Sequence, residues 1–147
     1  MPRLQFTGPE PALFETDIQI YISHVNQGGH LDHAQLMTLA SEARLRFFQW
    51  LGYRESTVEG CAIVVADIGA QYMSEGFHGE VMRVSLAPAD FNRYGFDLQF
   101  RMDEKTSGRP VARGKTGIVF IDPATRRPAA VPPAFMARIQ ARQSPAS

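Results

Sequence analysis

The polar run from Asn26 to His33 holds the groups of this sequence that are best suited to chemistry. It reads Asn-Gln-Gly-Gly-His-Leu-Asp-His and leads directly into a segment with helical periodicity. The start of a helix presents free backbone N–H groups and the positive end of the helix dipole, which bind anions and polarise carbonyl groups. The run is therefore suited to stabilise the negative oxygen that forms during acyl transfer.

Two carboxylates are candidates for the acid or base of such a site. Asp32 stands at the expected helix start, where aspartate typically caps the first N–H groups. Glu42 lies ten residues further along. If a sheet buries it, its pKa would rise and it could act as a base or nucleophile. The alternative for Glu42 is an ion pair with Arg46, one helical turn later.

The histidines of this region can be interpreted in two ways. His30 either bonds to the loop backbone and fixes the turn, or takes part in catalysis. His33 matters for its backbone N–H, which would stand at the first turn of the helix. His24, His30 and His33 do not match the spacing of a known zinc motif, so we expect no metal.

The elements that must position these groups follow from periodicity. Apolar residues spaced by three and four predict one long helix over residues 31–51, which Gly52 ends. The residues of its buried face are Leu36, Ala40, Ala43, Phe47 and Leu51. Alternating or β-rich runs predict strands over residues 17–23, 61–72, 80–87, 94–102 and 110–122. A short terminal helix near 133–143 is expected to lie on the surface as a flap.

One strand, one long helix and then about four more strands predict an α+β fold in which an antiparallel sheet wraps the helix. The segment from Gly29-His30 to Glu42-Ala43-Arg44 resembles the Gly-His-Val-Asn-Asn to Glu-Glu-Ala-Arg segment of hotdog-fold acyl-CoA thioesterases of the 4-hydroxybenzoyl-CoA thioesterase type. Further matches to this family are Tyr72 with Gly79-Glu80, and Phe120-Ile121-Asp122 through Arg127-Pro128 to Val131-Pro132. The resemblance covers about residues 17–133 of a chain that we expect to form a single domain, 1–147.

The resemblance implies hydrolysis of an acyl-CoA or acyl-carrier-protein thioester. Coenzyme A would be part of the substrate, and no separate cofactor is implied. The family's aspartate, three residues before the glycine, is replaced here by Asn26. Its amide cannot accept a proton at neutral pH, but it can orient a water or the thioester oxygen, so Asn26 stays a catalytic candidate. The acid would then be Asp32 or Glu42, and the N–H of His33 would polarise the thioester carbonyl.

The resemblance also implies where the substrate binds and how the chain assembles. Gly29, His30 and Tyr72 would contact the substrate, and Phe47, Phe48 and Tyr72 would line an apolar slot for the acyl group. Pairing of an exposed edge strand predicts a homodimer or a dimer of dimers. Two alternatives stay open: a non-hydrolytic acyl-CoA-binding protein, which Asn26 favours, and a hydratase or dehydratase. The sequence lacks the Asp-x-x-Pro-x-His pattern expected of hydratases.

Composition narrows the class of partner. Fifteen basic residues balance fifteen acidic ones, so nothing suggests binding to nucleic acid or to a membrane surface. The single cysteine, Cys61, cannot form an internal disulfide, which fits a reducing compartment. Residues 1–15 contain no long apolar run. We therefore expect a soluble, cytoplasmic protein that acts on a small molecule.

Overall fold

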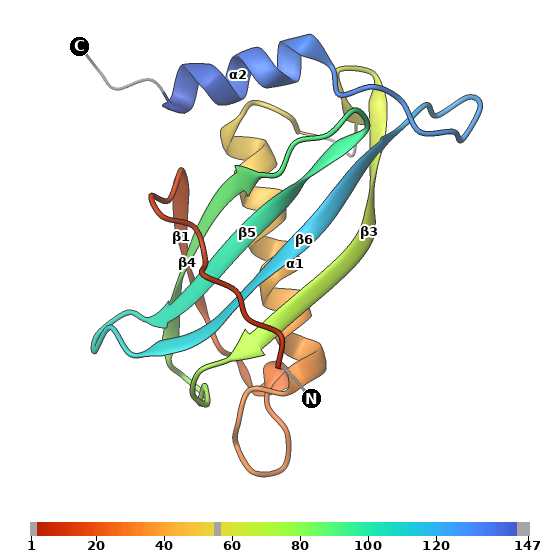
Figure 1. Ribbon diagram of the computed structural model, residues 1–147. Helices are drawn as coiled ribbons and strands as arrows, with labels where there is room; N and C mark the ends of the chain where they lie inside the picture. The colour runs from red at the N-terminus through yellow and green to blue at the C-terminus, as the bar shows by residue number, and fades with distance from the viewer. Residues whose placement is uncertain (1–2, 55–56, 144–147) are drawn as a thin grey trace.

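A computed structural model describes residues 3–54 and 57–143. It has an α+β fold in which a curled antiparallel sheet wraps one long helix, as the sequence predicted (Figure 1). The helices are η1 (Ile22–His24), α1 (His33–Trp50) and α2 (Pro133–Gln143). The strands are β1 (Phe14–Gln19), β2 (Thr57–Val58), β3 (Cys61–Tyr72), β4 (Val81–Ala89), β5 (Gly95–Glu104) and β6 (Pro110–Ile121).

Within the described residues the sheet has six strands in the order β1-β4-β5-β6-β3-β2, and all of these pairs are antiparallel. Alternation along the strands separates its two faces: on β5, Phe96, Leu98, Phe100 and Met102 are buried, whereas the residues between them are only half-buried. The buried face packs toward α1 and forms the core. The two-residue strand β2 was not predicted, because a pair of residues is too short to show a period.

Helix α1 is positioned by its apolar face, as its spacing predicted. All five residues named for the buried face are buried in the core. Gly52 follows the helix with φ of +102°, a conformation that side chains with a Cβ rarely adopt. The helix therefore has a fixed rotation beneath the sheet, and this fixes where its N-terminus points.

Several boundaries differ from the sequence prediction; strand β1, for example, begins at Phe14 rather than at residue 17. Two of the differences have a clear local reason. Strand β1 ends at Gln19 rather than near residue 23, because the N–H of Tyr21 donates to His24 Nδ1 at 2.9 Å and starts the turn η1. Helix α1 begins at His33 rather than at residue 31. Leu31 is still extended, since its N–H donates to the carbonyl of Gly76 at 2.7 Å.

The outer face of the sheet carries the N-terminal arm. In Figure 1 the arm crosses in front of the sheet. Phe6 lies over Gly69 of β3, where a Cβ would stand 2.8 Å from the ring, and its N–H donates to Gln71. Arg101 of β5 holds the arm by donating to the carbonyl of Pro9 at 3.2 Å and to the carboxylate of Glu10 at 3.1 Å.

Helix α2 is anchored in the core by one face, so the expectation of a surface flap was wrong. Phe135 and Ile139 are fully buried, and Phe135 packs against the rings of Phe96 and Phe120, each with a centroid distance of 5.3 Å. The physical reason is that one end of the curled sheet leaves these rings uncovered by α1. Helix α2 lies across that end (Figure 1).

Candidate active site at the start of the central helix

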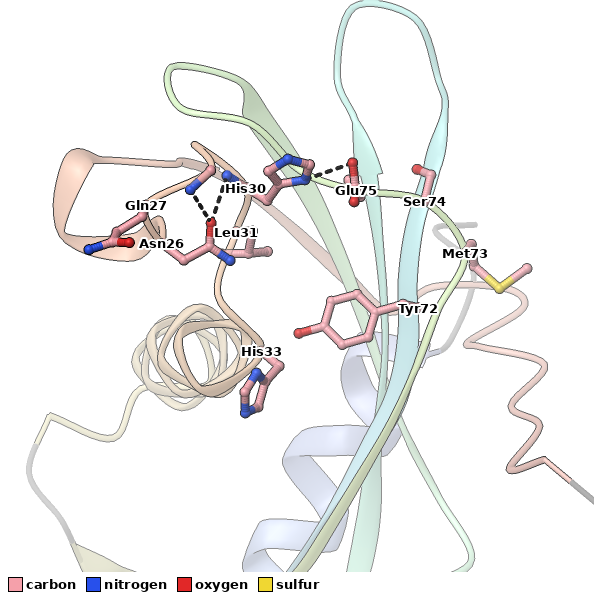
Figure 2. A pocket seen from close by; sticks show the side chains of 10 residues that line it. Asn26, Gln27, His30, Leu31, His33, Tyr72, Met73, Ser74 and Glu75 are labelled. Carbon is pink, nitrogen blue, oxygen red and sulfur yellow. Dashed lines mark hydrogen bonds and ion pairs between the residues drawn. The ribbon is translucent and has the colours of Figure 1, made fainter. Parts of the chain in front are cut away.

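The loop before α1 is organised by the side chain of Asn26. Its Oδ1 accepts hydrogen bonds from the N–H of Gly28 at 3.0 Å and from the N–H of His30 at 3.3 Å (Figure 2). The backbone N–H of Asn26 in turn donates to the carbonyl of His30 at 2.9 Å. Gly29 closes this turn with φ of +79°, in the region that favours glycine. The amide at this position therefore braces the loop.

The loop delivers the chain to a capped helix end. Asp32 has extended backbone angles, and its Oδ2 accepts the N–H of Ala34 at 3.0 Å, so it caps α1 as the sequence predicted. The N–H of His33 stands at the first helical position, where no carbonyl of the same helix can reach it. The positive end of the dipole and this N–H together make the helix start a place where a negative oxygen is stabilised.

A cleft of about 860 Å³ opens beside this helix end. Its lining includes Asn26, His30, His33, Tyr72 and Glu75. Figure 2 shows the Tyr72 hydroxyl directed toward the start of α1. Burial raises the pKa of Tyr72, and the nearby Asp32 carboxylate raises it further. Tyr72 therefore keeps its proton at neutral pH and can donate a hydrogen bond.

The structure also brings a residue into the cleft that the sequence did not single out. Glu75, in the loop after β3, contacts His30, with Oε2 2.7 Å from Nδ1 (Figure 2). His30 thus bonds to a carboxylate instead of the loop backbone that was one expectation for it. Glu75 belongs to no periodic pattern or local motif, so only the fold reveals this pairing.

Glu42 lies apart from this cleft. It lines a smaller groove between β1 and α1, of about 440 Å³. Its Oε2 accepts from Arg46 Nε at 2.7 Å, as the helical spacing of the two residues suggested. Arg46 also donates to Thr16 and to the carbonyl of Asp17, which ties the pair to β1. Within one chain, the structure does not bring Glu42 together with Asn26 and Tyr72.

The expected apolar slot is also different. Phe47 and Phe48 are buried in the core, and their rings pack against Trp50 and Phe135, so they do not line the cleft. Of the three residues expected to line the acyl slot, only Tyr72 lines the observed cleft. The reason is that Phe47 and Phe48 lie near the C-terminal end of α1, whereas the cleft opens at its N-terminal end.

The sequence matches the thioesterase-like superfamily over residues 20–139, most of the chain. The chain belongs to this superfamily. The match includes α1, the loop before it and all strands but β1, so it covers the whole cleft. Membership supports thioester hydrolysis as the general activity of the chain. None of the curated proteins compared with the sequence matches it.

Solved structures with the same fold include thioesterases and proteins that bind coenzyme A. Slr0204, a 1,4-dihydroxy-2-naphthoyl-CoA thioesterase from Synechocystis, is 18% identical, with a TM-score of 0.80 over 90% of this chain and 98% of that one. SAV2348 from Staphylococcus aureus, in complex with CoA, is 20% identical, with a TM-score of 0.79 over 88% and 82%. A Thermus thermophilus thioesterase, complexed with coenzyme A and Zn, is 22% identical, with a TM-score of 0.76 over 93% and 100%. These likenesses establish the hotdog fold.

Two kinds of feature are absent from residues 3–54 and 57–143. In this part of the chain no group of three or more His, Cys, Asp or Glu side chains could hold a metal ion. None of its helices is both long and apolar enough to cross a membrane.

Proposed function

We propose that the cleft at the start of α1 hydrolyses the thioester of an acyl-CoA, or of an acyl-carrier protein. The observation that carries the proposal is the convergence of three features on one cleft: a helix N-terminus, the loop braced by Asn26, and the Tyr72 hydroxyl. The coenzyme A complexes of two proteins with the same fold support the choice of substrate.

In this proposal the backbone and Tyr72 stabilise the charge that develops on the substrate. The thioester carbonyl oxygen lies at the helix start, where the N–H of His33 and the hydroxyl of Tyr72 donate to it. Water attacks the carbonyl carbon, and the oxygen becomes an oxyanion. Loss of one such donor typically lowers the rate by a factor of about 10² to 10³. His30 lines the cleft in which the substrate lies, and Gly29 closes the turn that carries His30.

A panel of short, medium, long and aryl acyl-CoA esters tests the proposal, with release of free thiol as the measurement. Tyr72→Phe provides the matched variant, because it removes the hydroxyl and keeps the ring. We expect thiol release by the wild type and slower turnover by Tyr72→Phe. If the folded wild type released no thiol from any ester of the panel, the proposal would be wrong.

The alternative that Asn26 favours is binding without hydrolysis, since an amide stands where the family has an acid. A binding protein would be stabilised against heat by acyl-CoA through ligand linkage, and would show no turnover. The same panel, read once by thiol release and once by melting temperature, separates the two functions.

We also propose that two copies pair along β3, as a homodimer or within a dimer of dimers. In the described chain, β3 pairs with β6 on one side, whereas on the other side it pairs with β2 at Cys61 and Ala62 only. The apolar side chains of Val65 and Ile68 on this strand are 45% and 41% exposed. Pairing would cover this edge and extend the wall that carries Tyr72. A monomeric mass at micromolar concentration, measured by light scattering, would contradict it.

A further inference from the structure

The cleft contains few groups that can take a proton from water. Of the residues that line it, Glu75 alone carries a carboxylate, and His30 and His33 carry imidazoles. Asn26 offers an amide, which is no base at neutral pH. Asp32 uses one carboxylate oxygen to cap α1, and Glu42 is paired with Arg46 in another groove. The His33 side chain is 87% exposed, whereas that of His30 is 36% exposed and contacts Glu75, so His30 and Glu75 are the candidates for the base.

These two side chains are arranged as an oriented base. With Nδ1 of His30 2.7 Å from the Glu75 carboxylate, Nδ1 carries the proton and donates it in a hydrogen bond. In the neutral form of this imidazole the lone pair is on Nε2, which has no hydrogen-bond partner among residues 3–54 and 57–143 and can accept a proton. The imidazole also packs against Phe77, with a ring centroid distance of 5.2 Å. Carboxylate and ring together fix both the tautomer and the orientation.

The loop of Asn26 makes room for the imidazole. A Cβ at Gly28 would stand 3.0 Å from Cδ2 of His30 and 3.4 Å from Nε2. A side chain at this position would push the ring away or cover the free nitrogen. The backbone of His30 is fixed as well, since its N–H donates to Asn26 Oδ1 and its carbonyl accepts from the N–H of Asn26.

Arg109, in the turn between β5 and β6, fixes the backbone of Glu75 from the other side. Its Nη2 donates to the carbonyl of Glu75 at 3.0 Å and to the carboxylate of Glu80 at 2.8 Å. Its Nε donates to Ser74 Oγ at 3.1 Å. The Ser74 hydroxyl in turn donates to the carbonyl of Pro110 at 2.6 Å, so it is not prepared as a nucleophile. In the described part of the chain, the carboxylate that contacts the His30 side chain is that of Glu75, and Arg109, paired with Glu80, holds the Glu75 backbone.

We propose that His30 is the general base of the thioester hydrolysis and that Glu75 is its positioning residue, a proposal that rests on the function proposed above. His30 Nε2 takes a proton from water, and the water oxygen bonds to the thioester carbonyl carbon. When the tetrahedral intermediate collapses, the carbon–sulfur bond breaks and the imidazolium returns the proton to the leaving thiolate. The products are the carboxylic acid and coenzyme A thiol. The Glu75 carboxylate stabilises the imidazolium while it exists.

The test measures kcat, KM and the pH dependence of kcat for His30→Gln and Glu75→Gln, on the acyl-CoA that the wild type hydrolyses best. We expect kcat to fall by a factor of about 10² to 10⁴ in His30→Gln, with KM little changed. Glu75→Gln should lower kcat less and move the acid limb of its pH profile to lower pH, because a neutral amide no longer stabilises the imidazolium. A merely structural role for Glu75 would not move that limb.

Matched controls keep the interpretation specific. His78→Gln changes an exposed histidine in the same loop as Glu75, and Glu10→Gln changes an exposed glutamate on the outer face of the sheet. Both should keep the wild-type kcat and pH profile. If His30→Gln reduces the folded fraction, then Glu75→Gln decides, because the Glu75 side chain is 63% exposed and its loss should leave the fold intact.

Several outcomes would overturn the proposal while the thioesterase function stands. One is wild-type kcat in both His30→Gln and Glu75→Gln. Another is a rise in KM alone, which would indicate a binding role. A third is a fall of about a hundredfold in the kcat of Glu42→Gln or Asp32→Asn while Glu75→Gln keeps the wild-type kcat. One of those two carboxylates would then be the catalytic acid or base. An inactive wild type would remove this proposal together with the proposed function.

Discussion

Two substitutions of Asn26 should separate its effect on stability from its effect on catalysis. Asn26→Ala removes the oxygen that accepts the N–H groups of Gly28 and His30 at 3.0 and 3.3 Å. Each such bond contributes about 0.5 to 1.5 kcal/mol. Because Asn26 is exposed, water partly replaces both bonds, so we expect a loss of about 1 to 2 kcal/mol in the free energy of unfolding.

Asn26→Asp keeps an oxygen of the same size in the same place. The carboxylate accepts both N–H groups at least as well as the amide does, because charge strengthens a hydrogen bond. It also lies near the helix N-terminus, where the dipole favours a negative charge by a few tenths to about 1 kcal/mol. The free energy of unfolding should therefore equal that of the wild type or exceed it slightly.

The assay is a urea unfolding curve for each protein, followed by the pH dependence of acyl-CoA turnover. Asn26→Ala should lower the midpoint with an unchanged slope and should slow turnover, because the loop that carries His30 loses its brace. Asn26→Asp should unfold like the wild type and change the pH profile, because it adds a group that can accept a proton inside the cleft. If both variants matched the wild type in stability, turnover and acyl-CoA binding, Asn26 would neither brace the loop nor belong to the site.

Two further predictions concern the opposite end of α1. Arg138→Ala removes a guanidinium that donates to the carbonyl of Leu51 at 2.7 Å and lies 4.5 Å from the Tyr53 ring centroid. We expect the free energy of unfolding to fall by about 2 kcal/mol, which corresponds to about 4 to 8 °C in Tm. The loss should be smaller for Arg142→Ala, because its hydrogen bond to the carbonyl of Trp50 is exposed to water. Equal Tm values for Arg138→Ala and the wild type would show that the bond from Arg138 to Leu51 does not stabilise the end of α1. Burial raises the pKa of Tyr53 to about 12, so the folded chain holds this proton more tightly than the unfolded chain, and stability should fall as pH rises from about 10 to about 12. The urea midpoint should fall less over this pH range in Tyr53→Phe than in the wild type. If the midpoints of both proteins fell equally with pH, the raised pKa of Tyr53 would not cause the loss of stability.

The sequence predicted those parts of the fold that depend on local pattern. The buried face of α1, the cap at Asp32 and the strands β3 to β6 all follow from spacing within a short window. The loop from Asn26 to His33 is equally short, so the sequence also predicted that it lies at the start of α1. The spacing of four residues predicts the ion pair between Glu42 and Arg46 as one of two interpretations of Glu42, and the structure contains this pair.

What could not be predicted depends on contacts between distant segments. Glu75 reaches His30 for two reasons. Strand β3 continues as far as Tyr72, and Arg109, which lies more than thirty residues later in the sequence, fixes the loop that follows β3. Phe135 has the spacing of any surface helix residue, and its burial follows from the rings of Phe96 and Phe120 at the open end of the sheet. Neither contact leaves a trace in local sequence.

The two ends of α1 show how the fold supports a reactive site. At the C-terminal end, Arg138 and Arg142 of α2 donate to the carbonyls of Leu51 and Trp50, and Phe135 fills the space beside them. At the N-terminal end, Asp32 takes the N–H of Ala34, whereas the N–H of His33 has no partner within the helix. A helix held firmly at one end can keep a free donor at the other end in a constant position. The cleft can therefore offer that N–H to a substrate oxygen without a prior rearrangement, and this is what stabilising an oxyanion requires.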